Sequence, residues 1–312
     1  METIAVLLMA YGSPNSLEEI EPYLLDIRGG RPTTPELVAE IRTRYAQIGG
    51  RSPLLDITRA QAAVLEEELN RSYADSDLNF RTYVGMRHWE PRIRKAVAQI
   101  TADGIHTAIG LVMAPHQSLL STGAYFSHLD TAITEQGVNL EVIRIDSWHD
   151  HPGLIDALAE KTSTALAGFD SPSYVLFTAH SLPMRILREG DPYDAQLRQT
   201  AALVAEQLDL APGRWQFCYQ SAGQSQESWL GPPIEQVIID LAQAGENNLL
   251  VTPIGFLCDH VEILYDLDII ARQVAHQHGA RLERSASLNV SPTFIAALAD
   301  LVWSYAPSLY RH

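Results

Sequence analysis

Two stretches of the sequence, YVLFTAHSLP at 174–183 and VLLMAYGSP at 6–14, share one pattern. In each, a short apolar run ends in a histidine or tyrosine, and a turn containing serine and proline follows. Such runs are typical of buried β-strands. A second pair repeats the likeness, because GLVMAPH at 110–116 matches LLVTPIGF at 249–256. We therefore expect one α/β unit that occurs twice in the chain.

Eight short apolar runs carry this unit, and each ends near glycine, proline or a polar residue. We expect strands at Ile4–Ala10, Phe80–Gly85, Thr107–Met113, Leu140–Ile145, Tyr174–Ala179, Arg214–Tyr219, Asn248–Thr252 and Arg281–Ser287. Amphipathic stretches separate them, and one of these is expected to bury Ile57, Ala60, Val64 and Leu65, with Asp56 available as its cap. Strands that alternate with helices predict parallel sheets with right-handed crossovers.

The expected fold is therefore α/β, with two similar Rossmann-like lobes and the ligand in the cleft between them. Each lobe is a four-stranded parallel sheet flanked by helices. A chain of 312 residues is too long for one ordinary core. We expect a first lobe at 1–148 with a lid-like insertion at 16–50, and a second lobe at 149–290. Residues 291–312 are expected to form a C-terminal helix that packs on the first lobe.

The composition narrows the class of protein. A formal net charge of −16 argues against a nucleic-acid partner, because such proteins present basic surfaces. The two cysteines, Cys218 and Cys258, are too few for an iron–sulfur cluster or a disulfide framework. Glu2 stands where a signal peptide would be basic, and no apolar run approaches the ~20 residues of a membrane span. These features predict a cytoplasmic protein.

His180 follows directly after the apolar run that ends at Ala179. A histidine at the carboxyl end of a parallel strand faces the sheet edge where open α/β sheets bind ligands. Neutral imidazole can ligate a metal ion or accept a proton near neutral pH. The position is equally compatible with a core histidine that is satisfied by backbone, so both interpretations stand here.

A second cluster, GFLCDHVEILYDLD at 255–268, begins after the strand that ends at Thr252 and then turns helical. Asp259, Glu262 and Asp266 are spaced i, i+3 and i+7, which predicts three carboxylates on one helical face. Such carboxylates repel one another, and a bound cation relieves the repulsion. A solvated acidic face is the alternative, but the remaining residues of the segment are apolar, as in a buried helix.

These residues carry a family resemblance. HSLP at 180–183 and GFLCDHVEILYD at 255–266 resemble the two signature motifs of ferrochelatases. Further matches occur in order along nearly the whole chain: MAYGSP at 9–14, YAQIGGRSPL at 45–54, APHQS at 114–118, GDPYDAQL at 190–197 and SWLGP at 228–232. The resemblance implies an enzyme of heme biosynthesis that inserts Fe²⁺ into a porphyrin and needs no organic cofactor.

The resemblance also implies the residues at the metal. The family's motif histidine and glutamate, here His180 and Glu262, face the porphyrin centre from one side. They are expected to accept the pyrrole protons or to be the first ligands of iron, and the sequence does not decide between these roles. Asp266 is expected to bind iron beyond them. Relatives often carry another acid near position 270, where this chain has Ile270, so the acidic line is shorter here.

Tyr11 indicates the branch of the family. Ferrochelatases that act on coproporphyrin III resemble this chain in having tyrosine after the first strand, where it faces the metal opposite the histidine. Relatives that use protoporphyrin generally have an apolar residue there. The resemblance therefore implies coproporphyrin III and Fe²⁺ as substrates and coproheme as the product. We expect a monomer that makes transient contacts with neighbouring enzymes of the pathway.

Other positions match the family's substrate contacts. Arginine suits the propionates because its guanidinium binds a carboxylate through two hydrogen bonds. His88 and Trp229 are expected to line the substrate site, whereas His116 is expected to be structural. Gly29 stands where relatives have a second arginine. The expected propionate contacts are Arg28, Arg44, Ser52 and Tyr125.

Three other functions remain compatible with these residues. The chain could be a protoporphyrin IX ferrochelatase, or a cobalt or nickel chelatase of the same fold, whose members tend to bind metal through several histidines. The third is a porphyrin-binding protein without catalytic activity.

Overall fold

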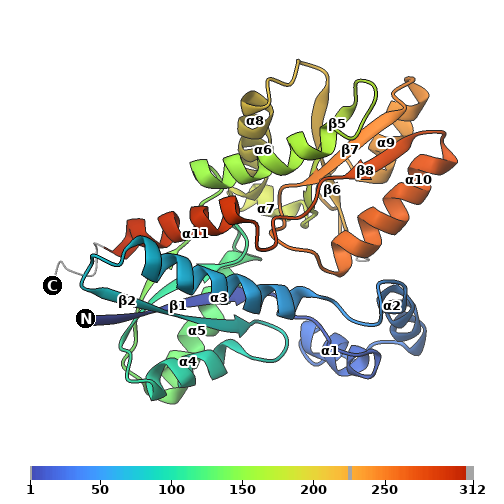
Figure 1. The fold of residues 1–312 in the computed structure, drawn as a ribbon. Helices are drawn as coiled ribbons and strands as arrows, with labels where there is room; N and C mark the ends of the chain where they lie inside the picture. Colours follow the sequence, from blue (N-terminus) through green and yellow to red (C-terminus); the bar gives the residue numbers. More distant parts are fainter. Residues whose placement is uncertain (1, 224–226, 307–312) are drawn as a thin grey trace. The chain divides into compact units, whose positions relative to one another are not determined.

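The computed structural model describes residues 2–223 and 227–306, and Figure 1 shows its ribbon. The chain divides into two compact units. Unit 1 contains the chain up to Trp148 together with the segment from Asn289 onward, and unit 2 runs from His149 to Leu288. The segment after unit 2 therefore belongs to unit 1. Residues 307–312, which the sequence assigned to the same final helix, lie outside the described residues.

Each unit is built on a four-stranded sheet whose strands are all parallel. Unit 1 has the order β2-β1-β3-β4 and unit 2 the order β6-β5-β7-β8, so β5 takes the place of β1 and β7 that of β3. The strands are β1 (Glu2–Ala10), β2 (Leu78–Met86), β3 (Thr107–Val112), β4 (Glu141–Ile145), β5 (Tyr174–His180), β6 (Trp215–Gln220), β7 (Asn248–Pro253) and β8 (Arg281–Arg284). All eight expected strands, and the twofold use of one α/β unit, are confirmed.

Helices connect these strands. Unit 1 contains η1 (Leu17–Glu19), α1 (Ile20–Ile27), α2 (Pro35–Gln47), α3 (Leu54–Ser72), α4 (Ile93–Ala102), α5 (Thr122–Gln136) and α11 (Pro292–Tyr305). Unit 2 contains α6 (Pro152–Leu166), α7 (Arg185–Arg188), α8 (Tyr193–Gln207), α9 (Ile234–Gln243), the π-helix η2 (Glu262–Ala271) and α10 (Arg272–Gln277). The insertion expected at 16–50 consists of η1, α1 and α2.

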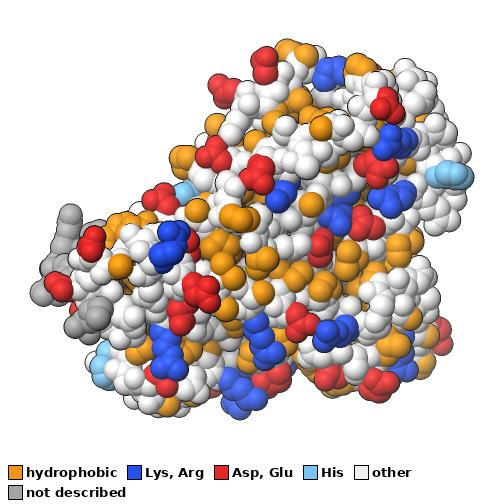
Figure 2. All heavy atoms as spheres, viewed as in Figure 1, with side chains coloured by type: hydrophobic (Ala, Val, Ile, Leu, Met, Phe, Trp, Pro, Cys, Tyr) orange, Lys and Arg blue, Asp and Glu red, His pale blue; other side chains and the backbone are white. Residues whose placement is uncertain are grey.

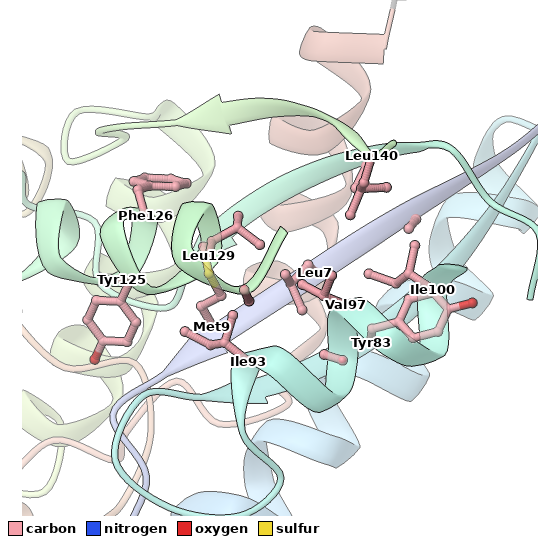
Figure 3. Close-up of a cluster of buried hydrophobic side chains, with 14 of the residues drawn as sticks. Leu7, Met9, Tyr83, Ile93, Val97, Ile100, Tyr125, Phe126, Leu129 and Leu140 are labelled. Carbon is pink, nitrogen blue, oxygen red and sulfur yellow. The ribbon is translucent and has the colours of Figure 1, made fainter. Parts of the chain in front are cut away.

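The central strand of unit 1 explains its continuous apolar sequence. Leu7 pairs with Tyr83 on one side and Gly110 on the other, and every residue of β1 from Ile4 onward is buried. A strand covered on both faces needs apolar side chains at every position rather than at alternate ones. In Figure 3, side chains from β1, β2, α4 and α5 meet in one cluster on one face of this sheet.

The buried face of α3 differs in part from the expected one. Leu65 is buried as expected, together with Leu55 and Leu69, whereas Val64 is 39% exposed. Asp56 does not cap the helix, because the N-cap residue is Pro53, which makes no side-chain hydrogen bond. Apolar residues occur on two adjacent faces of this helix, so their spacing alone did not identify the buried one.

The final helix completes unit 1. α11 lies along α3, as Figure 1 shows, and the ring of Trp303 stacks on that of Tyr73 with centroids 4.0 Å apart. The ring of Phe80, on β2, meets Trp303 edge-on. Aromatic pairs of this kind add about 0.5–1.5 kcal/mol to the stability that burial provides. The helix is therefore a structural part of the unit that begins the chain.

The surface agrees with a globular chain. No helix in the described ranges has the length and apolar character that a membrane span requires. On the face drawn in Figure 2, acidic and basic side chains are interspersed rather than separated by sign.

Gly255 is required by a close approach between backbone segments, which gives a test of the fold. Its N–H donates to the carbonyl of Thr178 at 3.2 Å, and a Cβ atom at position 255 would lie 2.5 Å from the Cβ atom of Ala179. We expect Gly255→Ala to lower the free energy of unfolding by about 1–3 kcal/mol, the usual cost of overpacking. Gly123→Ala is the control, because its nearest neighbour would lie at 3.5 Å. Urea denaturation of both variants measures this, and an unchanged midpoint for Gly255→Ala would contradict it.

Candidate active site

His180 is the last residue of β5, the strand in the middle of the unit 2 sheet. Its backbone carbonyl accepts a hydrogen bond from the hydroxyl of Tyr193 at 2.9 Å. Its Nδ1 lies in close contact with the carbonyl oxygen of Ser181, and a carbonyl can only accept. Nδ1 therefore carries the hydrogen, which leaves Nε2 of the neutral ring with a free electron pair for a proton or a metal ion.

Glu262 faces that nitrogen. One carboxylate oxygen lies 3.5 Å from Nε2 of His180, and the other lies 3.5 Å from Nε2 of His260. About a third of each of the His180 and Glu262 side chains is exposed. The predicted pair is therefore present as a contact within unit 2, in reach of solvent, and His260 is a third member that the sequence interpretation did not include.

The backbone at Glu262 is tied to β5 through Gln220. The Gln220 amide donates to the carbonyl of Glu262 at 2.9 Å and accepts from the hydroxyl of Thr178 at 2.8 Å. Gln220 ends β6 and is buried, so its amide joins three segments at the carboxyl edge of the sheet. Sequence reasoning missed this residue, because a glutamine at the end of a strand carries no pattern of its own.

Charge and burial set the protonation of the pair. Burial disfavours the imidazolium form of His180, but the nearby Glu262 carboxylate outweighs this and raises the pKa of His180 above its ordinary value. Burial likewise opposes ionisation of Glu262, yet the positive charge that His180 carries when it is protonated, together with the nearby imidazole of His260, lowers the pKa of Glu262. The carboxylate therefore stays ionised, and the imidazole takes up a proton readily.

The helix that begins at Glu262 is a π-helix, with i→i+5 hydrogen bonds, and such segments are frequent at functional sites. Asp266 lies one turn along it and accepts a hydrogen bond from the hydroxyl of Ser221. The prediction that Asp259 shares this helical face is wrong. Asp259 precedes the helix, where it accepts a hydrogen bond from Ser287 at 2.7 Å.

Arg284 contacts two acids, Asp259 before the π-helix and Asp268 inside it. Its guanidinium binds Asp268, inside the π-helix, through two bonds of 2.7 and 2.9 Å, and it lies 3.3 Å from Asp259. The side chain of Arg284 is only 12% exposed. A two-bond arginine–carboxylate pair fixes orientation as well as distance. Arg284 thus secures the segment that carries Glu262, a role that the sequence did not suggest for an arginine on an edge strand.

Unit 1 brings Tyr11 and His88 together. Tyr11 follows β1 and is 43% exposed, and its ring centroid lies 4.7 Å from that of His88. The backbone N–H of His88 donates to the carbonyl of Tyr11 at 2.8 Å. Asp26 lies 2.9 Å from Nδ1 of His88 and 2.7 Å from Arg92. Burial lowers the pKa of His88 and outweighs the opposing effect of Asp26.

The expected propionate contacts differ in accessibility. Arg28 is exposed at the end of α1, and Arg44 binds Glu40 one turn away within α2. Ser52 and Tyr125 are both buried. The Ser52 hydroxyl accepts a hydrogen bond from the N–H of Leu54 at the start of α3, which explains its burial.

Trp229 is half-buried, and its ring centroid lies 6.5 Å from that of His180. A Cβ atom at position 223 would lie 2.4 Å from this ring, so Gly223 leaves the space that the indole occupies. His116 is 2% exposed. Within the described ranges, no group of three or more His, Cys, Asp or Glu residues is arranged as a ready metal site.

Comparisons with known proteins give consistent results. The family model described as Ferrochelatase matches residues 3–306. The chain is 42% identical to "Ferrochelatase" of Herpetosiphon aurantiacus, over 96% of this chain and 97% of that protein. It is 39% identical to "Coproporphyrin III ferrochelatase" of Geobacillus kaustophilus, over 96% and 95%. Among solved structures, "SirB from Bacillus subtilis with Fe3+" aligns with a TM-score of 0.60 at 12% identity, over 99% of both chains, which shows a shared fold.

The His180–Glu262 contact predicts a measurable titration. Because the carboxylate raises the pKa of His180, the imidazole stays protonated to a higher pH than an ordinary histidine, and Glu262→Gln should move its titration to lower pH. NMR of the ring nitrogens in the metal-free protein reads this directly. Glu283→Gln, an exposed carboxylate on β8 that pairs with Arg281, is the control and should leave His180 unchanged. An identical His180 titration in wild type and Glu262→Gln would refute the coupling.

Proposed function

The chain belongs to the ferrochelatase family, and we propose that within it the protein inserts Fe²⁺ into coproporphyrin III to give coproheme. The observation that carries the proposal is the contact between His180 and Glu262 at the carboxyl edge of the unit 2 sheet. This pair combines an ionised carboxylate with an imidazole whose outward nitrogen is free to accept a proton. Fe²⁺ is a substrate in this reaction.

The chemistry requires a base. Two pyrrole N–H bonds break as the metal binds the four ring nitrogens, so two protons leave for each Fe²⁺ that enters, and no electron is transferred. Nε2 of His180 is the proposed acceptor, because Glu262 stabilises the imidazolium that forms. Both side chains are about a third exposed, so His180 can return the first proton to water before it accepts the second.

Asp266 has a different proposed role. Its carboxylate lies one turn beyond Glu262 and is oriented by Ser221. Oxygen ligands of this kind suit a hydrated divalent cation. We assign Asp266 to the capture of iron and not to proton removal. The next turn carries Ile270, which is half-buried, so the line of acidic side chains ends at Asp266.

The choice of coproporphyrin III rests on unit 1. Tyr11 occupies in unit 1 the place that His180 occupies in unit 2, since each directly follows the buried run of the second strand in its sheet. Its exposure leaves the phenol available to a substrate. The exposed guanidinium of Arg28 suits a propionate, of which coproporphyrin has four. Some relatives are named ferrochelatase and others coproporphyrin III ferrochelatase, so their names do not decide the porphyrin. Tyr11 and Arg28 are the residues that support coproporphyrin III.

The first test concerns the pair itself. His180→Ala and Glu262→Gln should each lower kcat for iron insertion by about 10²–10⁴-fold, the usual effect of removing a general acid–base group. Porphyrin binding, measured by fluorescence in the absence of iron, should persist. Asp266→Asn is the matched comparison and should raise KM for Fe²⁺ more than it lowers kcat. Near-normal turnover by His180→Ala would overturn the proposed mechanism.

The second test concerns the porphyrin. We expect kcat/KM for coproporphyrin III to exceed that for protoporphyrin IX under the same detergent conditions. Arg28→Met should reduce this preference, because it removes one propionate contact. Arg71→Met removes the same charge from an exposed arginine that pairs with Glu68 on α3, and it should leave the preference intact. A preference for protoporphyrin IX would keep the family assignment and reject the coproporphyrin branch.

A further inference from the structure

Arg87 of unit 1 is a half-buried cation without an acidic partner among the described residues. Its Nε atom is buried and makes no hydrogen bond, and its Nη1 makes only a long one, of 3.4 Å, to the carbonyl of Leu120. The guanidinium lies 5.6 Å from the ring centroid of Tyr125. Figure 3 shows Tyr125 at the edge of the core cluster, with its hydroxyl pointing away from the other labelled side chains.

Two other arginines of unit 1 have an acidic partner of the kind that Arg87 lacks among the described residues. Arg144 also lies over an aromatic ring of α5, 5.3 Å from the centroid of Phe126, but Asp130 neutralises it at 2.5 Å. Arg92 is bound by Asp26 at 2.7 Å. A charge that is partly removed from water is costly unless a counter-charge or hydrogen bonds compensate it. The donors of Arg87 are therefore suited to an anion that the chain does not supply.

A cavity of about 380 Å³ adjoins this side chain. Arg87, Arg92, Arg94 and His128 contribute donors to its walls. Two acids, Glu90 and Glu135, also line it, and Glu90 is already bound by Lys95 at 2.8 Å. Ile93 and Ala132 add apolar surface. The lining contains more arginines than acids, in a protein whose formal net charge is −16.

His128 adds a second kind of donor. Partial burial and then the positive charge of Arg87 lower the pKa of His128, so the imidazole is neutral near pH 7. A neutral imidazole retains one N–H group, which can donate to an anion without adding a further charge. The position of His128 on α5, one turn beyond Tyr125, places it on the same wall as the ring that supports Arg87.

We propose that this cavity is an anion-binding site for a phosphate or carboxylate group, with Arg87 as its principal ligand. The site lies in unit 1 and shares no residue with the His180–Glu262 pair. A free anion there would not depend on the proposed function, whereas a porphyrin propionate would rest on it. Two sources could supply the group: a small free anion, or a propionate of the porphyrin. Both would present oxygens to the fork of donors on Arg87.

The test begins with the full chain free of porphyrin. Inorganic phosphate, and then succinate, are titrated by calorimetry at constant ionic strength against sodium chloride. Wild type should bind at least one of them with saturation, and Arg87→Met should bind about tenfold or more weakly, since the contact is charge-assisted. Arg144→Met, which removes an arginine already paired with Asp130, should bind as wild type does.

Two further measurements complete the test. The melting temperature of Arg87→Met without anion should equal or exceed that of wild type, because the variant removes a half-buried charge that no acidic side chain among the described residues compensates. If saturating phosphate weakens porphyrin binding, the group is a propionate, and if porphyrin binding is unaffected, it is a free anion. Absence of saturable binding in wild type, or equal affinity in folded Arg87→Met, would overturn the proposal.

Discussion

The central interaction of unit 2 is the contact of the ionised Glu262 carboxylate with the imidazoles of His180 and His260. A carboxylate in this position needs cationic or donating neighbours on both oxygens, and it needs a backbone that does not move. Each carboxylate oxygen lies 3.5 Å from a histidine Nε2, while Gln220 binds the backbone carbonyl of the same residue. Arg284 then binds Asp268, inside the helix, and lies 3.3 Å from Asp259, which precedes it. Several polar side chains thus hold one carboxylate in place, and that carboxylate raises the pKa of His180.

The two units show how one scaffold supplies two different groups. Parallel strands have their carboxyl ends at a single edge of each sheet, and the residue that follows the buried run of β1 or β5 lies there. In unit 2 that residue is an imidazole, whereas in unit 1 it is the phenol of Tyr11. The supporting neighbours differ as well, because Tyr11 packs on His88 and His180 faces a carboxylate. The repeated topology explains why short sequence matches between the halves were informative.

The sequence was a reliable guide to the strands and the central pair, and a poor one to what supports them. Strands covered on both faces require unbroken apolar runs, so all eight could be recognised. His180 could be found because it directly follows such a run, and Glu262 because of its spacing from other carboxylates and the family motif that contains it. Contacts between distant segments leave no periodic signal, so the roles of Gln220 and Arg284 were not predictable. Spacing also failed for α3, where two adjacent faces are apolar, and at Asp259, where helical geometry was assumed one turn too early.

Unit 2 is a single continuous segment inserted between two pieces of unit 1. During synthesis, the whole of unit 2 leaves the ribosome before α11 does, so its sheet can form while unit 1 still lacks the helix that covers α3. Until α11 arrives, the ring of Tyr73 and the neighbouring edge of β2 remain open to water and to chaperones. Unit 1, whose translation begins first, is therefore the unit that is completed last.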